Sequence, residues 1–183
     1  MKNKPLQVLL VEDNAGDVRL LREMFSEERP DSFEITHFLR MSEAEIYLAK
    51  GEVDIVLLDM GLPDEHGLDT VRRSLAAAPD VPVIVITGLD DETLATEAMK
   101  VGAQDYLIKG QIENRALPRA LRHAIERHQL DQRLRDQQLY TRSLIESNID
   151  ALMATDPRGN VTDVNQQMEV LTGCTRPLAS PHL

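Results

Sequence analysis

Short apolar runs alternate with amphipathic stretches over the first two thirds of the chain. The runs are rich in aliphatic and β-branched residues, which is typical of strands. The five predicted strands are Leu6–Val11, Phe33–Phe38, Val53–Leu58, Val83–Thr87 and Asp105–Ile108. Between them, apolar residues recur at helical spacing, as at Val18, Leu21 and Phe25. Strands that alternate with helices predict an α/β fold, in which a doubly wound five-stranded parallel sheet is covered by helices on both faces.

Two details of the pattern refine this prediction. The segments Ile55–Leu58 and Val83–Ile86 are apolar without interruption, which indicates strands that are buried on both faces. Ser42 is followed three residues later by Glu45, which is the spacing of a capping box. We therefore expect Ser42 to cap the second helix.

A long helix is predicted after the last strand. From Glu113 to about Ser147 there is no glycine, and Pro118 fits the first turn of a helix. Three of its apolar residues are expected to pack on the sheet, namely Leu117, Leu121 and Ile125. Further apolar residues continue beyond any domain that five strands could build, namely Leu130, Leu134, Leu139 and Leu144. Polar residues interrupt every heptad register there, so a dimeric coiled coil and a solvated single helix both remain open.

The last part of the chain has a different pattern. Ala151–Ala154 and Val161–Val164 flank the turn-forming segment Asp156–Asn160, which predicts a strand, a tight turn and a second strand. We expect a first domain over residues 1–128, a helical linker over 129–147, and a partial α+β appendage over 148–183.

Charge and cysteine content exclude several classes of function. The chain carries 31 acidic and 20 basic residues, a net charge of −11, which argues against a nucleic-acid partner. Cys174 is the single cysteine, so no internal disulfide can form and a reducing compartment is expected. The apolar run Leu6–Val11 is too short for a signal peptide or a membrane span. We therefore expect a cytoplasmic protein without a membrane partner.

Polar residues of particular chemistry follow four of the predicted strands. They are Glu12 and Asp13, Asp59, Thr87 and Lys109. Because the carboxyl ends of parallel strands meet at one edge of the sheet, these residues should lie together. Three converging carboxylates repel one another, and a hard cation such as Mg²⁺ relieves that repulsion through oxygen ligands. The pattern predicts a magnesium-dependent phosphoryl-transfer site.

The segments around these residues resemble, in order and spacing, the motifs of response-regulator receiver domains. They are Val8–Asn14, Leu57–Pro63 with Gly67, Val85–Gly88 and Gly102–Lys109. The resemblance spans residues 5 to about 128. It implies a flavodoxin-like sheet of order 2-1-3-4-5 and a phosphoacceptor module of a two-component phosphorelay, with a histidine kinase or a phosphotransfer protein as partner.

The resemblance also implies roles for the carboxylates. Asp59 would be the nucleophile that accepts the phosphoryl group. Asp13, Asp59 and the backbone carbonyl of Gly61 would hold Mg²⁺, and Glu12 would act through a water molecule.

Other roles implied by the resemblance concern phosphoryl contacts and switching. Lys109 and the Thr87 hydroxyl would contact phosphoryl oxygens, and Thr87 and Tyr106 would switch together. Lys109 is followed by Gly110, where the family usually has proline in a cis peptide. The fixed loop geometry that such a proline provides is therefore expected to be lost.

The segment from Leu144 to about Arg176 resembles the opening of a PAS sensor domain. The residues that carry this resemblance are Leu144–Ser147, Asp156–Val161, Asn165 and Leu171–Gly173. It implies that the receiver signals through its last helix to a downstream sensor or output region.

Two other functions stay open at this stage. The first is a degenerate receiver that serves as a protein-binding scaffold. The second is an Asp-nucleophile phosphatase of the haloacid dehalogenase class, although Gly61 stands where that class needs a second Asp. We expect no enzyme activity beyond self-catalysed phosphotransfer and dephosphorylation.

Overall fold

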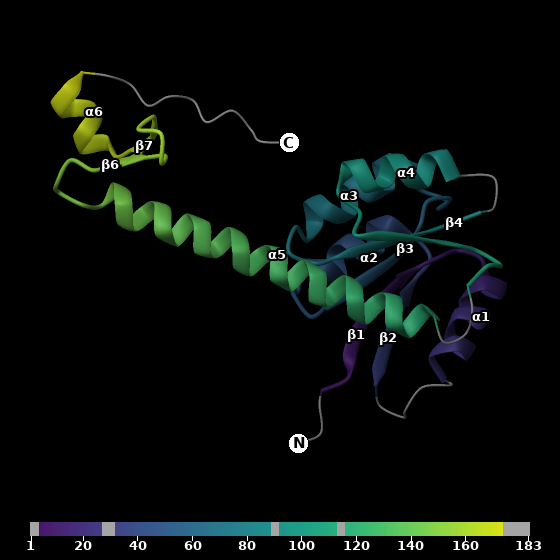
Figure 1. The fold of residues 1–183 in the computed structure, drawn as a ribbon. Helices are drawn as coiled ribbons and strands as arrows, with labels where there is room; N and C mark the ends of the chain where they lie inside the picture. Colours follow the sequence, from purple (N-terminus) through teal and green to yellow (C-terminus); the bar gives the residue numbers. More distant parts are fainter. Residues whose placement is uncertain (1–3, 27–31, 89–91, 113–115, 174–183) are drawn as a thin grey trace. The chain divides into compact units, whose positions relative to one another are not determined.

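A five-stranded parallel sheet organises the first part of the chain (Figure 1). The computed structural model describes residues 4–26, 32–88, 92–112 and 116–173. The strands are β1 (Leu6–Val11), β2 (Phe33–Phe38), β3 (Ile55–Asp59), β4 (Val83–Thr87) and β5 (Asp105–Ile108). Their order is β2-β1-β3-β4-β5, and all four neighbouring pairs are parallel. The predicted fold class and strand order are confirmed.

One strand differs from its predicted bounds. β3 begins at Ile55 instead of Val53, and it includes Asp59, which pairs with Ile86 of β4. Asp59 therefore belongs to the strand itself, so the sheet directly fixes the position of its backbone.

Helices cover both faces of the sheet. The helices are α1 (Ala15–Ser26), α2 (Met41–Leu48), α3 (Leu68–Ala77), α4 (Glu92–Val101) and α5 (Ala116–Glu146). One face packs against α2, α3 and α4, and the other packs against α1 and the beginning of α5. Successive residues of β1 point to opposite faces. Leu9 belongs to the apolar core beneath α2, α3 and α4, whereas Leu10 belongs to the core beneath α1 and α5. The central strands are buried on both faces, which accounts for their uninterrupted apolar sequences.

The start of α2 corrects the capping-box prediction. The helix begins at Met41, its N-cap is Arg40, and the Arg40 side chain makes no capping hydrogen bond. Asp64, from the loop after β3, instead accepts hydrogen bonds from the backbone N–H groups of Met41 and Ser42, both at 3.0 Å. A carboxylate distant in sequence thus satisfies the N–H groups that a local cap would have served.

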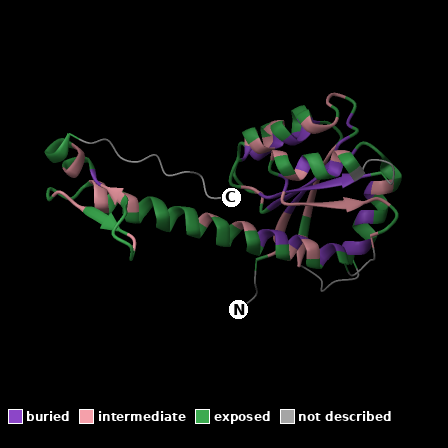
Figure 2. Cartoon of the chain, turned by 45° about the horizontal axis from the view of Figure 1, so that its top comes forward, coloured by how far each residue is buried: buried purple, intermediate pink, exposed green. Residues whose placement is uncertain are grey.

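Helix α5 is the predicted long helix and contains 31 residues. The start of the predicted range, residues 113–115, lies outside the described residues. Its buried residues all lie in the first half, and they include the three predicted ones, Leu117, Leu121 and Ile125. The second half of the helix is largely exposed (Figure 2). Its exposed residues include the four leucines predicted to lie beyond the domain, Leu130, Leu134, Leu139 and Leu144. The chain divides within this helix into two compact units, residues 1–129 and 130–183.

The second unit has a polar centre. It contains an antiparallel hairpin of β6 (Met153–Thr155) and β7 (Val161–Val164), followed by α6 (Gln166–Thr172). This confirms the predicted strand, turn and strand, although β6 starts two residues later than expected. Among the described residues of the unit, Asn165 alone is fully buried. Its side chain caps α6 by accepting from the Met168 N–H, and it donates to the Asp150 carbonyl at 2.8 Å.

Candidate functional site

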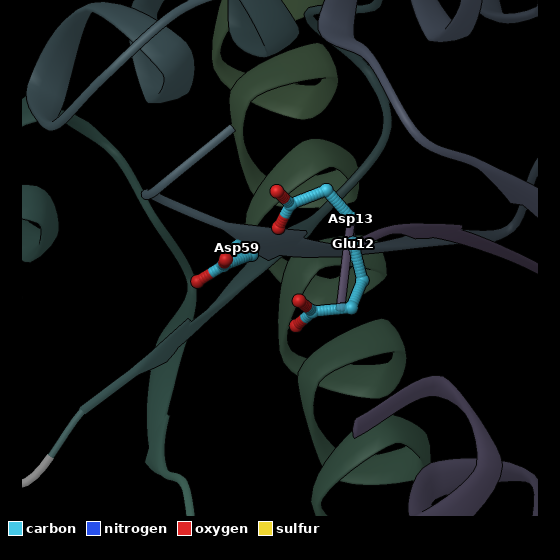
Figure 3. Close-up of side chains that lie close together, drawn as sticks. All are labelled: Glu12, Asp13 and Asp59. Atoms are coloured by element: carbon cyan, nitrogen blue, oxygen red, sulfur yellow. The ribbon is translucent and has the colours of Figure 1, made fainter. Parts of the chain in front are cut away.

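Three carboxylates converge where β1 and β3 end. Glu12 and Asp13 directly follow β1, and Asp59 is the last residue of β3 (Figure 3). One carboxylate oxygen from each residue lies within 4.8 Å of the other two. The adjacent pairing of β1 with β3 produces this convergence, because it places the ends of two strands side by side.

Glu12 has contacts through both its side chain and its backbone carbonyl. Its side chain is fully buried. Its Oε1 accepts from the Asn14 N–H at 3.0 Å, and its Oε2 lies 2.8 Å from the Lys109 ammonium. Its backbone carbonyl accepts from the His37 ring at 2.8 Å. Burial raises the pKa of Glu12 above its ordinary value, and the charge of Asp59 adds to this effect, although the hydrogen bonds from Lys109 and Asn14 oppose it.

Lys109 places a cation beside two of these carboxylates, Glu12 and Asp59. Its Nζ lies 2.8 Å from Glu12, 2.9 Å from Asp17 and 3.3 Å from Asp59. Burial alone would lower the pKa of Lys109, but the hydrogen bonds to Glu12 and Asp17 and the charge of Asp59 raise it above its ordinary value. The ammonium is therefore charged throughout the physiological range.

Asp17 is a partner of Lys109 that the sequence did not reveal. It lies in the first turn of α1, where an acidic residue is common because it complements the helix dipole. Its one sequence signal is its place four residues after Asp13, at the start of the helix that leaves the site. That signal does not distinguish an ion-pair partner from an ordinary acidic residue of a first turn.

Thr87 and Tyr106 lie on the neighbouring strands. Thr87 is buried at the end of β4, one residue beyond the partner of Asp59, and its hydroxyl donates to the Gly88 carbonyl at 3.1 Å. Its own carbonyl accepts from the Lys109 N–H at 2.7 Å, which joins the ends of β4 and β5. Tyr106 is half-buried on β5 and packs against the core beneath α2, α3 and α4.

Two glycines shape the rim of the site. A Cβ at Gly61 would lie 3.6 Å from an Asp59 carboxylate oxygen, so the backbone of Gly61 passes close to that side chain. Gly110, directly after Lys109, has a φ of +81°, a backbone conformation that glycine adopts readily.

The donor set of the cluster fits a hard divalent cation. Glu12, Asp13 and Asp59 offer carboxylate oxygens, and Asp13 is exposed while the other two are buried. The three carboxylates outnumber the single ammonium of Lys109, so a negative charge remains to be neutralised. All-oxygen ligands with excess negative charge are the preferred environment of Mg²⁺.

Comparison with known proteins identifies the class. The family described as "Response regulator receiver domain" matches residues 8–122. The match covers more than half of the chain, and the chain therefore belongs to this family. The matched range ends before the second unit, so the PAS-like segment and the helical linker remain predictions.

Individual relatives agree with this assignment. The virulence transcriptional regulatory protein PhoP of Salmonella typhimurium strain LT2 is 36% identical over 105 residues, which are 57% of this chain and 45% of that protein. The transcriptional regulatory protein PhoP of Escherichia coli K12 is 34% identical over the same length. The chain thus spans less than half the length of these relatives.

Solved structures show the same fold. A response regulator receiver domain protein from Clostridium thermocellum is 27% identical with a TM-score of 0.60, and the match covers 68% of this chain and 98% of that one. The signal receiver domain of an HD domain-containing protein from Pseudomonas fluorescens Pf-5 is 25% identical with a TM-score of 0.63, covering 73% and 96%. Within the part of the chain that the structure describes, no helix has the length and apolar character that crossing a membrane requires.

Proposed function

We propose that this receiver accepts a phosphoryl group on Asp59 from a phosphohistidine of a histidine kinase or phosphotransfer protein. The observation that carries the proposal is the environment of Asp59. Its carboxylate ends a central strand, lies 3.3 Å from the Lys109 ammonium, and belongs to the cluster with Glu12 and Asp13. A carboxylate so placed is a nucleophile with a cation ready for the charge of the incoming group.

The transfer itself is a substitution at phosphorus. A carboxylate oxygen of Asp59 forms the new P–O bond as the P–N bond to the donor histidine breaks, and the electron pair of that bond leaves with the imidazole nitrogen. Lys109 donates to one phosphoryl oxygen, and the Thr87 hydroxyl turns from the Gly88 carbonyl to another. Thr87 ends β4 and Lys109 directly follows β5, and these two strands are neighbours, so the sheet brings both donors to the same edge.

Mg²⁺ completes the site in this proposal. Asp13, Asp59 and the Gly61 carbonyl would hold it directly, with Glu12 acting through a water molecule. When bound, the ion neutralises the carboxylates and polarises a phosphoryl oxygen. The exposure of Asp13 supports its direct role, and the contacts of both Glu12 oxygens with Asn14 and Lys109 support an outer one.

Signalling is proposed to follow from movement of Thr87 and Tyr106. Phosphorylation would shift an existing equilibrium of these two side chains and change the surface formed by α4, β5 and α5. The exposed second half of α5, which is most of the predicted linker over residues 129–147, would carry the change to the PAS-like segment over 148–183. We also propose that Leu130, Leu134, Leu139 and Leu144 support a homodimer, and that the protein acts in the cytoplasm.

The deciding experiment is phosphorylation by a small acyl-phosphate donor with Mg²⁺, followed by intact mass. We expect a single phosphoryl group on the parent chain and none on Asp59→Asn or after chelation of the metal. Asp69→Asn is the matched control, because Asp69 is an exposed carboxylate on α3 that pairs with Arg72. Equal labelling of Asp59→Asn would refute the assignment, and an unlabelled parent would favour a scaffold function.

A further inference from the structure

The ammonium of Lys109 is shared among three carboxylates. An ammonium has three N–H donors, and Glu12, Asp17 and Asp59 each lie within ion-pair distance of it. Asp17 is closer to the nitrogen, at 2.9 Å, than Asp59 is at 3.3 Å. Asp17 lies outside the carboxylate cluster that fits a metal. Its contact with the site is therefore through Lys109.

The backbone around Lys109 explains why such a contact is needed. The Lys109 N–H is fixed by the Thr87 carbonyl, but the next residue, Gly110, has no side chain. A Cβ at Gly110 would meet no atom within 4 Å, so this side of the loop is not packed. Backbone hydrogen bonds fix the start of the Lys109 side chain but not its flexible end, so the carboxylates that contact the ammonium set its position.

Asp17 is attached to a rigid element. Its neighbour in α1, Val18, is buried, as is Leu21 one turn farther on, and both belong to the core between α1, α5 and the sheet. The exposed fraction of the side chain is 31% for Asp17 and 25% for Lys109. The ion pair thus joins a packed helix to the turn after β5.

We propose that Asp17 is a positioning residue that holds the Lys109 ammonium beside Asp59 during phosphoryl transfer. The inference rests on the proposed function. When Asp59 becomes phosphorylated, a phosphoryl oxygen replaces its carboxylate oxygen as the acceptor for one N–H of the Lys109 ammonium. The other two N–H groups remain bonded to Glu12 and Asp17. The third donor then points at the phosphoryl group without a search among side-chain rotamers, which reduces the entropic cost of the transition state.

The test compares Asp17→Ala with the parent in the acyl-phosphate reaction. Alanine removes the acceptor and is tolerated well in a helix. We expect the rate at saturating donor to fall about fivefold, as for a partly exposed charge pair. The rates are compared at saturating Mg²⁺, because removal of a nearby charge also affects the affinity for the ion. The donor concentration at half-maximal rate should stay unchanged, because Asp17 does not contact the donor in this proposal. Asp17→Glu should recover most of the rate.

Glu23→Ala is the matched control. Glu23 lies on the same helix and pairs with Arg19, and both side chains are largely exposed. The control should phosphorylate at the parent rate. A rate of Asp17→Ala equal to that of the parent, or a fall shared by Glu23→Ala, would overturn the role of Asp17.

A second readout does not depend on how the variant folds. In the parent labelled with ¹⁵N and ¹³C, NMR should detect a coupling between Lys109 Nζ and Asp17 Cγ, through the hydrogen bond that the ammonium donates to Asp17 Oδ2. Absence of this coupling would overturn the inference even if the parent is phosphorylated normally. A parent chain that takes up no phosphoryl group would instead refute the proposed function, and with it any role of Asp17 in that reaction.

Discussion

Glu12, Asp13 and Asp59 carry the same functional group in three different environments. Glu12 is fully buried with partners on both oxygens, Asp59 retains 8% exposure at the end of β3, and Asp13 is exposed. Both oxygens of Glu12 already contact Asn14 or Lys109, whereas the exposed carboxylate of Asp13 can turn toward a metal ion with little loss of other contacts. We therefore expect Asp13 to contact the metal directly and Glu12 to act through a water molecule.

We predict that Asp13→Ala weakens Mg²⁺ binding about tenfold or more, because a charge a few ångströms from the ion is removed. Glu12→Gln should weaken it far less, since glutamine keeps the shape and an acceptor oxygen. Calorimetric titration with Mg²⁺ measures both affinities, with Asp69→Asn as a surface control. An unchanged affinity in Asp13→Ala would contradict its role as a direct ligand.

Thr87 provides a second prediction at this scale. Its hydroxyl contacts the Gly88 carbonyl, and a phosphoryl mimic on Asp59 should draw it away. We expect the NMR signals of the Tyr106 ring to shift when the mimic is added to the parent, and not in Thr87→Ala. Thr36→Ala is the control, because Thr36 also carries a strand hydroxyl, which contacts Tyr47. The same shift in Thr87→Ala would show that the Tyr106 ring responds to the mimic without the Thr87 hydroxyl.

At the scale of elements, the loop between β3 and α3 is fastened to α2. Asp64 in this loop caps α2 through Met41 and Ser42. The guanidinium of Arg73 on α3 joins Glu65 of the loop, at 3.0 Å, to Glu45 of α2, at 2.6 Å. The same loop begins with Met60 and Gly61, directly after Asp59. These contacts therefore hold the backbone on which the Gly61 carbonyl depends.

We predict that Asp64→Ala lowers the free energy of unfolding by about 1 kcal/mol at neutral pH, as loss of a helix cap does. Desolvation raises the pKa of Asp64, but the hydrogen bonds from Ser42 and Met41 prevail and hold it below its ordinary value of 3.8. The stabilisation is thus complete above the unfolded-state pKa and is lost as the pH falls through the lower folded-state pKa.

Urea unfolding at about pH 7 and about pH 3 measures this effect. The difference between Asp64→Ala and the parent should be smaller in acid. Asp69→Ala is the control, since it removes an exposed carboxylate that pairs with Arg72 on α3. A difference that does not depend on pH would show that the Asp64 charge is unimportant at the start of α2.

At the scale of the whole molecule, the two units are stabilised in different ways. The first buries two apolar cores, one on each face of its sheet. The second is held by hydrogen bonds of Asn165 and by an ion pair of Arg142 with Asp163, while large apolar side chains stay exposed. Examples are Ile149 at 89%, Val170 at 75% and Leu171 at 72%. Apolar burial is the main driving force of folding, so the second unit should be much less stable.

We predict that residues 151–183 do not form an independent domain in this chain, since a lone hairpin is marginal in water. Trypsin should cleave rapidly after Arg158 and leave a stable core that ends between about residues 128 and 145. Protection that disappears on dilution would indicate docking on a second copy. Protection at all concentrations would refute the prediction.

Much of the fold and of the candidate site follows from local sequence. Strand positions were predicted because apolar runs of strand length are visible without any tertiary information. Glu12, Asp13, Asp59, Thr87 and Lys109 were found because each lies at or just after the end of such a run, and parallel strands bring those ends together. The long α5 was predicted because the segment has no glycine and a proline only in its first turn.

Tertiary structure alone decided which distant groups became partners. The capping of α2 by Asp64 and the pairing of Asp17 with Lys109 join segments that are far apart in sequence, and either acidic residue could have remained on the surface. The different burial of Glu12 and Asp13 likewise depends on what packs beside each of two adjacent carboxylates. Sequence periodicity determines which face of an element is apolar and where the element ends. The partner of each polar side chain depends on the positions of other elements, which exist only after the sheet and its helices have assembled.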